Sequence, residues 1–496
     1  MLPPAAIRRR PAMQAFACLL LGLLAGGCAS YTKKTEELRQ AWAVGDTLTA
    51  AQEAQSEADD SPTGIDALLW RLEEGSGFRY ANDYVSSNQA FEQAEDRVRY
   101  YDKQAEISVS EEFLATITNL STLPYRGTAY DRIMLNTYKA LNYLSLGDPE
   151  AARVELNRAL DRQREAVAEN AKAIADAEQL ADDASARSRS QPQDAYNVNA
   201  AERDRRYQNQ LSSAYVYLNQ YQAYSNYVNP FTVYLEGLYF MTNGLSYGDF
   251  ERARKALQRA YGMHQGNRYL MRDLAQVESL IAGEPLPATT YVIFESGMAP
   301  TRREIRIDIP LFIVTREVPY VGVAFPQLQF NNRYIRGLNV SADGQSYSTE
   351  LLCDMDAIVA QDFNNELPVI QAKTLISAGV KAGIQYGMYQ AAGDNENAQI
   401  IAMIAGSIYA VSTNRADLRT WVTLPKKISY ARLPRPSDGR VQISLQGGQQ
   451  FNLSLIDAHV SVIYIKSNAP GAQVSVQQFP LMLEASADGS LSSLAL

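Results

Sequence analysis

The spacing of apolar residues changes near residue 285, and this change limits the folds open to the chain. Residues 31–283 place apolar side chains every 3.6 positions and hold few glycines or prolines, which is typical of helices. Gly283-Glu284-Pro285-Leu286-Pro287 interrupts this pattern. β-Branched residues at every second position follow, which is typical of strands. The sequence therefore predicts an α+β protein with several domains: a helical one at 28–283, a linker at 284–289, a β-rich one at 290–480 and a tail at 481–496.

Small and large residues recur in the same order at three places in the helical part. In each place a turn is followed by a small residue, a large residue four positions later and an alanine three positions after that, so two antiparallel helices can pack closely. This order resembles the tetratricopeptide repeat, whose helix pairs stack into a solenoid; a generic helical bundle is the alternative. The three units contain Gly75, Phe78, Asp83, Tyr84, Ser87, Phe91 and Ala94; Ala140, Tyr143, Gly147, Asp148, Ala152, Leu156 and Ala159; and Gly248, Asp249, Phe250, Ala253, Leu257 and Ala260.

A long insertion is predicted between the second and third units. The chain is rich in alanine and charge from Arg158 to about Ala186, with a narrow apolar stripe near heptad spacing. Residues 188–192 break this helix, and a tyrosine-rich helical run follows to Tyr227. We expect a long helical hairpin at about 160–228 that projects from the repeats.

The β-rich part is expected to be an antiparallel sheet of β-sandwich type. The predicted strands are 290–294, 304–309, 318–325, 334–340, 441–445, 451–455 and 460–465, the last three as a meander whose first pair is joined across Gly447-Gly448.

A helical hairpin at about 368–411 interrupts the strands. Both of its helices carry small residues four positions apart, which allows close backbone packing. One interpretation is that this hairpin packs on the sheet as core, because charged residues interrupt it and neither apolar run is long enough to span a bilayer. The other is a glycine zipper that associates with a membrane or with other copies. The packing residues are Gly379, Gly383, Gly387, Ala402, Gly406 and Ala410.

The first 28 residues have the composition of an export signal. Three arginines at 8–10 precede an apolar run at 13–25, which is too short to remain as a transmembrane helix. The run ends in Leu24-Ala25-Gly26-Gly27-Cys28, which resembles the lipobox of bacterial lipoproteins. The resemblance implies cleavage before Cys28 and lipid attachment to its thiol; an ordinary secretory signal is the alternative. Ala29 lacks the charge typical of inner-membrane retention, which favours the periplasmic face of the outer membrane.

The composition after cleavage excludes several classes of partner and bond. Loss of residues 1–27 removes three arginines and no acid, which leaves 43 basic and 55 acidic residues and a net charge of −12. An acidic surface repels phosphate backbones, so no nucleic-acid partner is expected. With Cys18 removed and Cys28 acylated, Cys353 has no partner for a disulfide. Its neighbours Leu351 and Leu352 indicate a buried, unreactive thiol.

The search for catalytic, metal or cofactor-binding motifs is mostly negative. The two histidines, His264 and His459, lie in different predicted domains, which argues against a histidine triad or a multi-histidine metal site. No phosphate-binding loop or nucleophile elbow is present. Asp354 and Asp356 could bind a cation or act in acid–base chemistry, but Asp356 also suits a helix N-cap. We therefore predict no catalytic residue, metal or cofactor.

Tyrosine is abundant, with 30 residues against 14 phenylalanines. Tyr217, Tyr221 and Tyr224 fall on one helical face. Such a stripe could grip a glycan or a peptide. The structural alternative, which we favour, is a partly hydrated seam between packed helices.

Two stretches of the β-rich part carry a family resemblance. Residues 291–300 (YVIFESGMAP), followed by Arg303-Glu304, and residues 415–425 (RADLRTWVTLP) are similar to signature segments of an uncharacterised proteobacterial family of outer-membrane lipoproteins with tetratricopeptide-like repeats. The resemblance implies a role in envelope biogenesis, with peptidoglycan-synthesis machinery as a candidate partner, and implies no activity. The segment around Trp421 is predicted to leave the hairpin as an extended strand with an aromatic anchor and to enter the sheet.

The favoured hypothesis is a non-enzymatic, membrane-anchored periplasmic scaffold that binds a protein or peptide partner. Arg79 and Tyr80, in the first helix of the first repeat, are the candidate residues of its concave partner groove. The first alternative is an envelope enzyme or glycan-binding protein that uses carboxylates such as Asp354 and Asp356. The second is an oligomeric export component that assembles through the glycine-rich hairpin.

Overall fold

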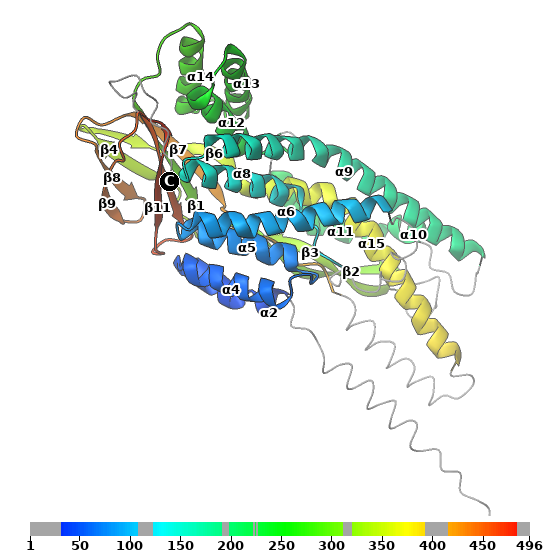
Figure 1. Cartoon of the computed structure of the whole chain (residues 1–496). Coiled ribbons are helices and arrows are strands. Elements are labelled where there is room, and N and C mark those ends of the chain that lie inside the picture. The colour runs from blue at the N-terminus through cyan, green and yellow to red at the C-terminus, as the bar shows by residue number, and fades with distance from the viewer. Residues whose placement is uncertain are drawn as a thin grey trace, which may run out of the picture.

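Helices form the first half of the chain and sheets the second, as predicted, with one long helix inserted between strands (Figure 1). The structure is a computed structural model and describes residues 31–107, 123–190, 198–221, 224, 227–310, 320–391 and 415–483. The helices are α2 (Tyr31–Lys34), α3 (Glu36–Val44), α4 (Thr47–Asp60), α5 (Ala67–Tyr80), α6 (Tyr84–Ile107), α8 (Ala129–Ser145), α9 (Pro149–Ser190), α10 (Val198–Glu202), α11 (Arg205–Tyr215), the 3-10 helix η2 (Val216–Gln220), α12 (Pro230–Asn243), α13 (Tyr247–Met263), α14 (Arg268–Ile281) and α15 (Met355–Ala391).

A turn joins the two helices of each predicted pair, the first two at the predicted positions and the third a few residues earlier, because Gly248 and Asp249 already lie inside α13. These turns join α5 to α6, α8 to α9, and α12 to α13. A methyl group at Gly75 would lie 2.4 Å from Cε1 of Phe91, and one at Gly237 would lie 2.8 Å from Cγ of Leu257. The missing side chain on one helix therefore makes room for the large residue on the next. Gly147 has φ 75°, a conformation that favours glycine and ends α8.

The strands belong to three sheets. They are β1 (Thr289–Ser296), β2 (Thr301–Pro310), β3 (Tyr320–Gln329), β4 (Leu338–Ala342), β5 (Gln345–Ser348), β6 (Glu350–Asp354), β7 (Lys427–Pro434), β8 (Arg440–Leu445), β9 (Gln450–Ser454), β10 (Val460–Ser467) and β11 (Ser475–Met482). A five-stranded sheet has the order β11-β10-β1-β7-β6, a four-stranded sheet the order β5-β4-β8-β9, and β2 pairs with β3.

The expectation of purely antiparallel sheets is wrong at the centre of the five-stranded sheet. β1 pairs with β10 in parallel, with Thr289 opposite Val460 and Ser296 opposite Ser467. The predicted β8–β9 hairpin is confirmed, but β10 leaves it for the other sheet, so the three-stranded meander is also wrong. Both central strands are buried on both faces, which is typical of parallel strands and removes the alternation from which direction and neighbours can be inferred.

The five-stranded sheet lies between the helices and the four-stranded sheet. Tyr291 and Tyr464 face the helices, whereas Val292 and Ile463 face a second cluster of buried side chains that they share with Val340 and other residues of the four-stranded sheet. The cluster on the helical side draws members from α2 through to β11. The predicted boundary at 284–289 therefore separates helices from strands along the chain, but it does not separate two cores.

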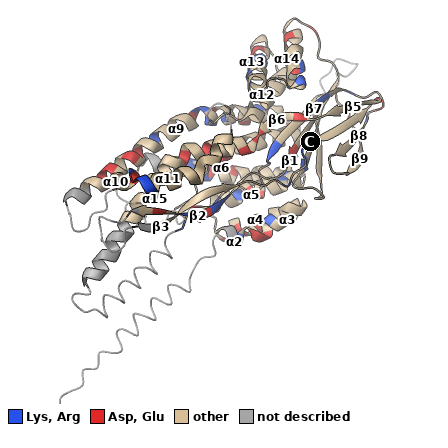
Figure 2. Ribbon diagram, turned by 180° about the vertical axis from the view of Figure 1, so that it is seen from behind, with Lys and Arg blue, Asp and Glu red and all other residues tan. Residues whose placement is uncertain are grey.

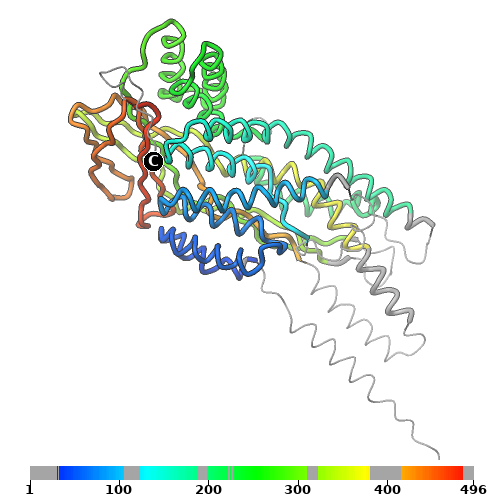
Figure 3. The backbone as a smooth tube through the Cα atoms, viewed as in Figure 1, coloured from blue at the N-terminus to red at the C-terminus, as the bar shows by residue number. Residues whose placement is uncertain are grey.

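The predicted insertion is a single long helix with a short return. α9 runs for 42 residues beside α8 and α15, while the described residues between α9 and α12 form α10, α11 and η2 (Figures 1 and 3). The full-length hairpin expected at 160–228 is wrong, because α15 takes the position expected of its second helix. Charged residues of both signs lie along α9 (Figure 2).

The helix predicted from Pro368 begins earlier. α15 starts at Met355 and continues through Pro368. Proline removes one backbone N–H and disfavours a helix interior, but buried side chains on both sides of it, such as Phe363 and Leu375, hold the helix in the core. Gly379, Gly383 and Gly387 lie in the second half of α15, while Ala402, Gly406 and Ala410 lie outside the described residues. None of the described helices is both long enough and apolar enough to cross a membrane.

Candidate functional site

The inner face of the helical layer is covered by the chain itself. We define this face as the side of α5, α8 and α12, the first helices of the three pairs, that meets the five-stranded sheet and residues 415–426. All fourteen residues of α5 are buried, and α8 and α12 are buried along most of their length. First helices line the concave face of a helical-repeat protein, so the surface predicted to receive a partner is occupied from within.

Residues 415–426 lie along α5 without regular secondary structure (orange in Figure 3). The Glu73 carboxylate accepts hydrogen bonds from the backbone N–H groups of Val422 (2.7 Å) and Thr423 (3.2 Å). The Trp421 indole N–H lies 3.0 Å from Ser76 Oγ and 2.8 Å from Thr423 Oγ1. The helix thus binds this segment through its main chain and one aromatic side chain, as grooves bind extended peptides.

Arg419 fixes the start of the same segment. Its guanidinium donates to Asp417 (2.7 Å) and to Asp66 (3.0 Å), the residue before α5. It also donates to the Leu123 carbonyl (2.8 Å). The predicted aromatic anchor at Trp421 is confirmed, because only 1% of its surface is exposed. The predicted entry into the sheet is wrong at this point, since the segment packs on helices and β7 begins only at Lys427.

Burial decides the protonation of Glu73. The carboxyl is fully buried, and this desolvation raises its pKa from an ordinary 4.5 to about 7, although the bonds from Thr423, Val422 and Tyr31 act in the opposite direction. The group that holds residues 422 and 423 therefore changes charge near neutral pH.

Stability is expected to fall as the pH rises from about 5 to 8. Between these values the folded protein keeps a proton on Glu73 that the unfolded chain releases, so raising the pH favours unfolding. A pKa raised from 4.5 to about 7 corresponds to roughly 3 kcal/mol in the free energy of unfolding. Burial also raises the pKa of Asp131 and of Asp356 to about 6, which acts in the same direction.

Glu73→Gln isolates the contribution of Glu73. Glutamine stays neutral, so the stability difference between wild type and variant should change by roughly 3 kcal/mol from pH 5 to pH 8 in urea unfolding. The matched control is Glu37→Gln, at an exposed position of α3, whose difference from wild type should stay constant. A parallel pH profile for wild type and Glu73→Gln would contradict the assignment.

Glu295 on β1 is the centre of a second buried cluster, where the helices meet the sheet. No part of its surface is exposed. It accepts hydrogen bonds from the hydroxyls of Tyr80, Tyr138 (3.2 Å) and Tyr464 (2.5 Å) and from the Lys466 ammonium (3.2 Å). Burial lowers the pKa of Lys466, while the nearby Glu295 acts against that shift. The cluster joins α5 and α8 to β1 and β10 through polar contacts in an otherwise apolar layer.

Arg79 and Tyr80, the predicted groove residues, belong to this cluster. Their exposed fractions are 0% and 2%. The Arg79 guanidinium donates to Asn142 Oδ1 (2.7 Å) and lies 4.9 Å from the centre of the Tyr464 ring. Neither residue reaches solvent, so the prediction that they line an open groove is corrected. The repeat analogy placed them on the inner face as expected, but it could not reveal that the sheet covers this face.

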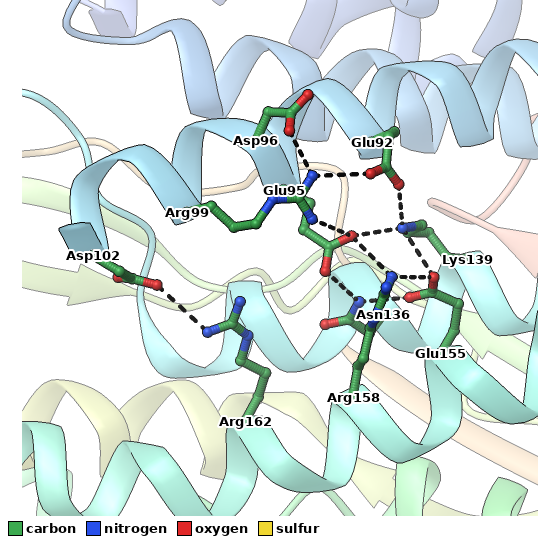
Figure 4. A network of polar contacts seen from close by, with 10 residues as sticks. All are labelled: Glu92, Glu95, Asp96, Arg99, Asp102, Asn136, Lys139, Glu155, Arg158 and Arg162. Atoms are coloured by element: carbon green, nitrogen blue, oxygen red, sulfur yellow. Dashed lines mark hydrogen bonds and ion pairs between the residues drawn. The ribbon is translucent and has the colours of Figure 1, made fainter.

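A third network, made of ion pairs and hydrogen bonds, joins α6, α8 and α9 to one another (Figure 4). The buried Lys139 ammonium contacts Glu92 (2.7 Å), Glu95 (2.7 Å) and Glu155 (3.0 Å). Burial alone would lower the pKa of Lys139, but the three carboxylates outweigh it and raise the pKa above its ordinary value. Arginines around the rim balance the remaining acids (Figure 4). The network fixes the three helices together and leaves no carboxylate of this trio without a cation.

The carboxylates of the enzyme alternative are also paired. Asp354 forms an ion pair with Lys427, and Asp356 with Lys426. Asp354, rather than the predicted Asp356, caps the N-terminus of α15, because it accepts a hydrogen bond from the Ala357 N–H (3.4 Å). These contacts explain both acids as structural groups.

The predicted buried thiol is confirmed. Cys353 is fully buried, and burial raises the pKa of its thiol. The two histidines lie apart, as expected: His264 packs against the Tyr224 ring, with 5.2 Å between ring centres, whereas His459 Nε2 lies 2.7 Å from the Leu286 carbonyl.

The tyrosine stripe forms a seam, although its partners are strands. Tyr221 stacks on Phe330, with 4.4 Å between ring centres, and the Tyr217 hydroxyl accepts the N–H of Leu328 (3.0 Å). A small cavity of about 20 Å³ lies nearby, between α8 and α15. It has room for about one water molecule, which is too small for a sugar ring or a peptide.

Sequence reasoning missed Glu73, Glu295 and Lys139. Glu295 interrupts the strand face that carries Tyr291 and Ile293, and that interruption was the available signal. Cys28 lies outside the described residues. No known protein family, curated protein or solved structure matches this chain.

Proposed function

We propose that the chain is a lipid-anchored scaffold of the bacterial envelope, in which tetratricopeptide-like hairpins and a β-sandwich-type part form one packed unit. The observation that carries this proposal is the filled inner face. Helix pairs that hold an extended segment through Glu73 and Trp421 use the chemistry of peptide-binding repeats. Here that chemistry holds the protein's own chain, so a partner has to bind elsewhere on the surface.

The contacts of the acidic residues also support a scaffold over an enzyme. A general acid or base has to reach a substrate, and a strongly shifted pKa in an open cleft is its usual mark. Glu73 and Asp356 have raised pKa values, but Glu73 bonds to the main chain and Asp356 to a buried lysine. Both groups are therefore buried and each has a structural partner.

The proposed anchor predicts a complete change of location on one substitution. Cys28→Ser removes the acceptor thiol, so incorporation of labelled palmitate should be lost and the protein should leave the membrane fraction. Ala29→Asp should keep the lipid and move the protein from the outer to the inner membrane. A Cys28→Ser protein that stays in the membrane fraction would refute the anchor.

The scaffold role is tested by cross-linking in intact cells followed by mass spectrometry. We expect cross-links from lysines and acids on the outer helices, such as those on α9, to envelope proteins. Cross-links should persist in a variant in which Asp354 and Asp356 are both replaced by asparagine, provided that it folds. Loss of a measurable envelope reaction in that folded variant, with cross-links unchanged, would favour the enzyme alternative.

A further inference from the structure

One sheet edge stays open in the part of the chain that the structure describes. The edge strands β5, β6 and β11 each make at least one hydrogen bond to a residue of a helix or of its cap. The Ser348 carbonyl of β5 accepts from Tyr269 (2.9 Å), the Leu351 carbonyl of β6 from Asn267 (2.9 Å), and Gln477 of β11 donates to the carbonyl of Arg79 (2.9 Å). β9 pairs with β8 on one side, and no helix runs along its other side in Figure 1 or Figure 2.

The hydrogen-bond register shows which groups of β9 point outward. Leu455 N–H donates to the Gly439 carbonyl (2.8 Å) and Leu445 N–H to the Gln449 carbonyl (2.9 Å). Because hydrogen-bonded and non-hydrogen-bonded pairs alternate in an antiparallel ladder, residues 451 and 453 direct their backbone groups to β8. Residues 450, 452 and 454 direct theirs away from it.

A side chain already imitates a neighbouring strand at one end of this edge. The amide of Gln478 donates to the Ser454 carbonyl (3.0 Å) and accepts from the Ile456 N–H (3.3 Å). These are the two bonds that a peptide group of an added strand would make. Among the described residues, the N–H and C=O groups of Gln450 and Asn452 have no such substitute.

The composition of β9 leaves this edge unprotected. Native sheet edges are usually blocked by lysine, proline or a covering element. β9 has the sequence Gln-Phe-Asn-Leu-Ser. The side chains of residues 450, 452 and 454, which share one face of the sheet, are exposed and uncharged. On the opposite face Phe451 and Leu453 are half-buried beside the core shared by the two sheets. An added strand would extend that core with every second side chain.

We propose that the free edge of β9 binds an extended segment of a partner protein, which adds a fifth strand to the four-stranded sheet. The segment has apolar residues at alternate positions and no charge opposite residues 450–454. A second copy of this chain is a poorer occupant, because pairing along a five-residue edge about 17 Å long buries much less surface than the roughly 1,200 Å² that a stable dimer buries. The inference rests on the proposed function, because the segment is expected to belong to a partner that the scaffold binds.

The test uses the purified full chain and a fluorescein-labelled heptapeptide of alternating valine and threonine between terminal lysines. Fluorescence anisotropy should report saturable binding. Asn452→Pro should weaken it at least tenfold, because proline removes an outward N–H that β8 does not use, while the melting temperature should change little. Asn452→Thr keeps the N–H and should bind as wild type does. Gln478→Ala frees the Ser454 carbonyl and should bind at least as tightly.

Several outcomes would overturn the inference. These are equal binding by wild type and Asn452→Pro, no anisotropy change at millimolar peptide, or equal binding of a peptide whose central threonine is replaced by proline. Sedimentation that reveals a dimer abolished by Asn452→Pro would assign the edge to a second copy instead. If the peptide does not bind but the cross-links to envelope proteins persist, only the proposed site on β9 is refuted. If the peptide binds but no cross-links to envelope proteins form, only the scaffold function is refuted.

Discussion

Trp421→Ala is expected to lower the free energy of unfolding by about 3–5 kcal/mol. The indole is almost fully buried and fills the space between Phe91 (6.0 Å between ring centres) and Tyr138 (5.8 Å). Truncation leaves a cavity lined by α5, α6 and α8, and it removes the donor that bonds Ser76 and Thr423. Because folded proteins are stable by only about 5–15 kcal/mol, urea unfolding should reveal a much less stable protein.

Trp421→Phe is the matched control for this prediction. Phenylalanine keeps an aromatic ring between Phe91 and Tyr138 but removes the indole N–H, so the loss should be about 1–2 kcal/mol. The loss of stability in Trp421→Phe then measures mainly the hydrogen bonds of the indole N–H, and the further loss in Trp421→Ala measures mainly the packing of the ring. A loss below about 1 kcal/mol for Trp421→Ala would mean that residues 415–426 contribute little to holding the two halves together.

The local features of the fold could be predicted from the sequence. The turn at Gly147 and the β8–β9 hairpin depend on neighbouring residues, and both are present. Cys353 was predicted to be buried from its apolar neighbours alone, and it is. In each case the deciding interaction joins residues close together in the chain, so composition and spacing carry the information.

Features that depend on distant segments could not be predicted. The parallel pairing of β1 with β10 joins Thr289 to Val460, and nothing local distinguishes it from a hairpin. The inner position of Arg79 followed from the repeat pattern, but its burial depends on β10 and β11, which come almost four hundred residues later. Glu73 and Glu295 read as solvated charges until the segments that cover them are known.

The filled inner face explains why these failures occur together. In an open repeat protein the first helices keep a polar surface for a partner, so charged residues there indicate binding. Here the same charges bond to the chain itself: Glu73 to residues 422 and 423, Arg79 to Asn142, and Glu295 to Lys466. Polar residues on an inner face therefore indicate that a polar segment binds there. They do not reveal whether that segment belongs to another protein or to a later part of the same chain.

Glu295→Gln is expected to destabilise the protein by about 3–5 kcal/mol, since breaking a buried ion pair leaves an uncompensated charge. The Lys466 ammonium is 1% exposed and has Glu295 as its carboxylate partner, at 3.2 Å. Lys466→Met should also destabilise, because it leaves the Glu295 carboxylate without its ammonium. The double variant restores electrical neutrality at this pair, so its loss of stability should be smaller than the sum of the two single losses by at least about 1 kcal/mol.

The pattern of the three losses separates an ion pair from a simple polar contact. The hydroxyls of Tyr80, Tyr138 and Tyr464 can still bond to glutamine, so a loss confined to hydrogen-bond geometry would be about 1 kcal/mol and additive with Lys466→Met. Glu295→Asp is the control that keeps the charge and shortens the side chain. Additive losses in urea unfolding would show that the charge at residue 295 is dispensable, and that the tyrosine hydroxyls and apolar packing alone join helices to sheet.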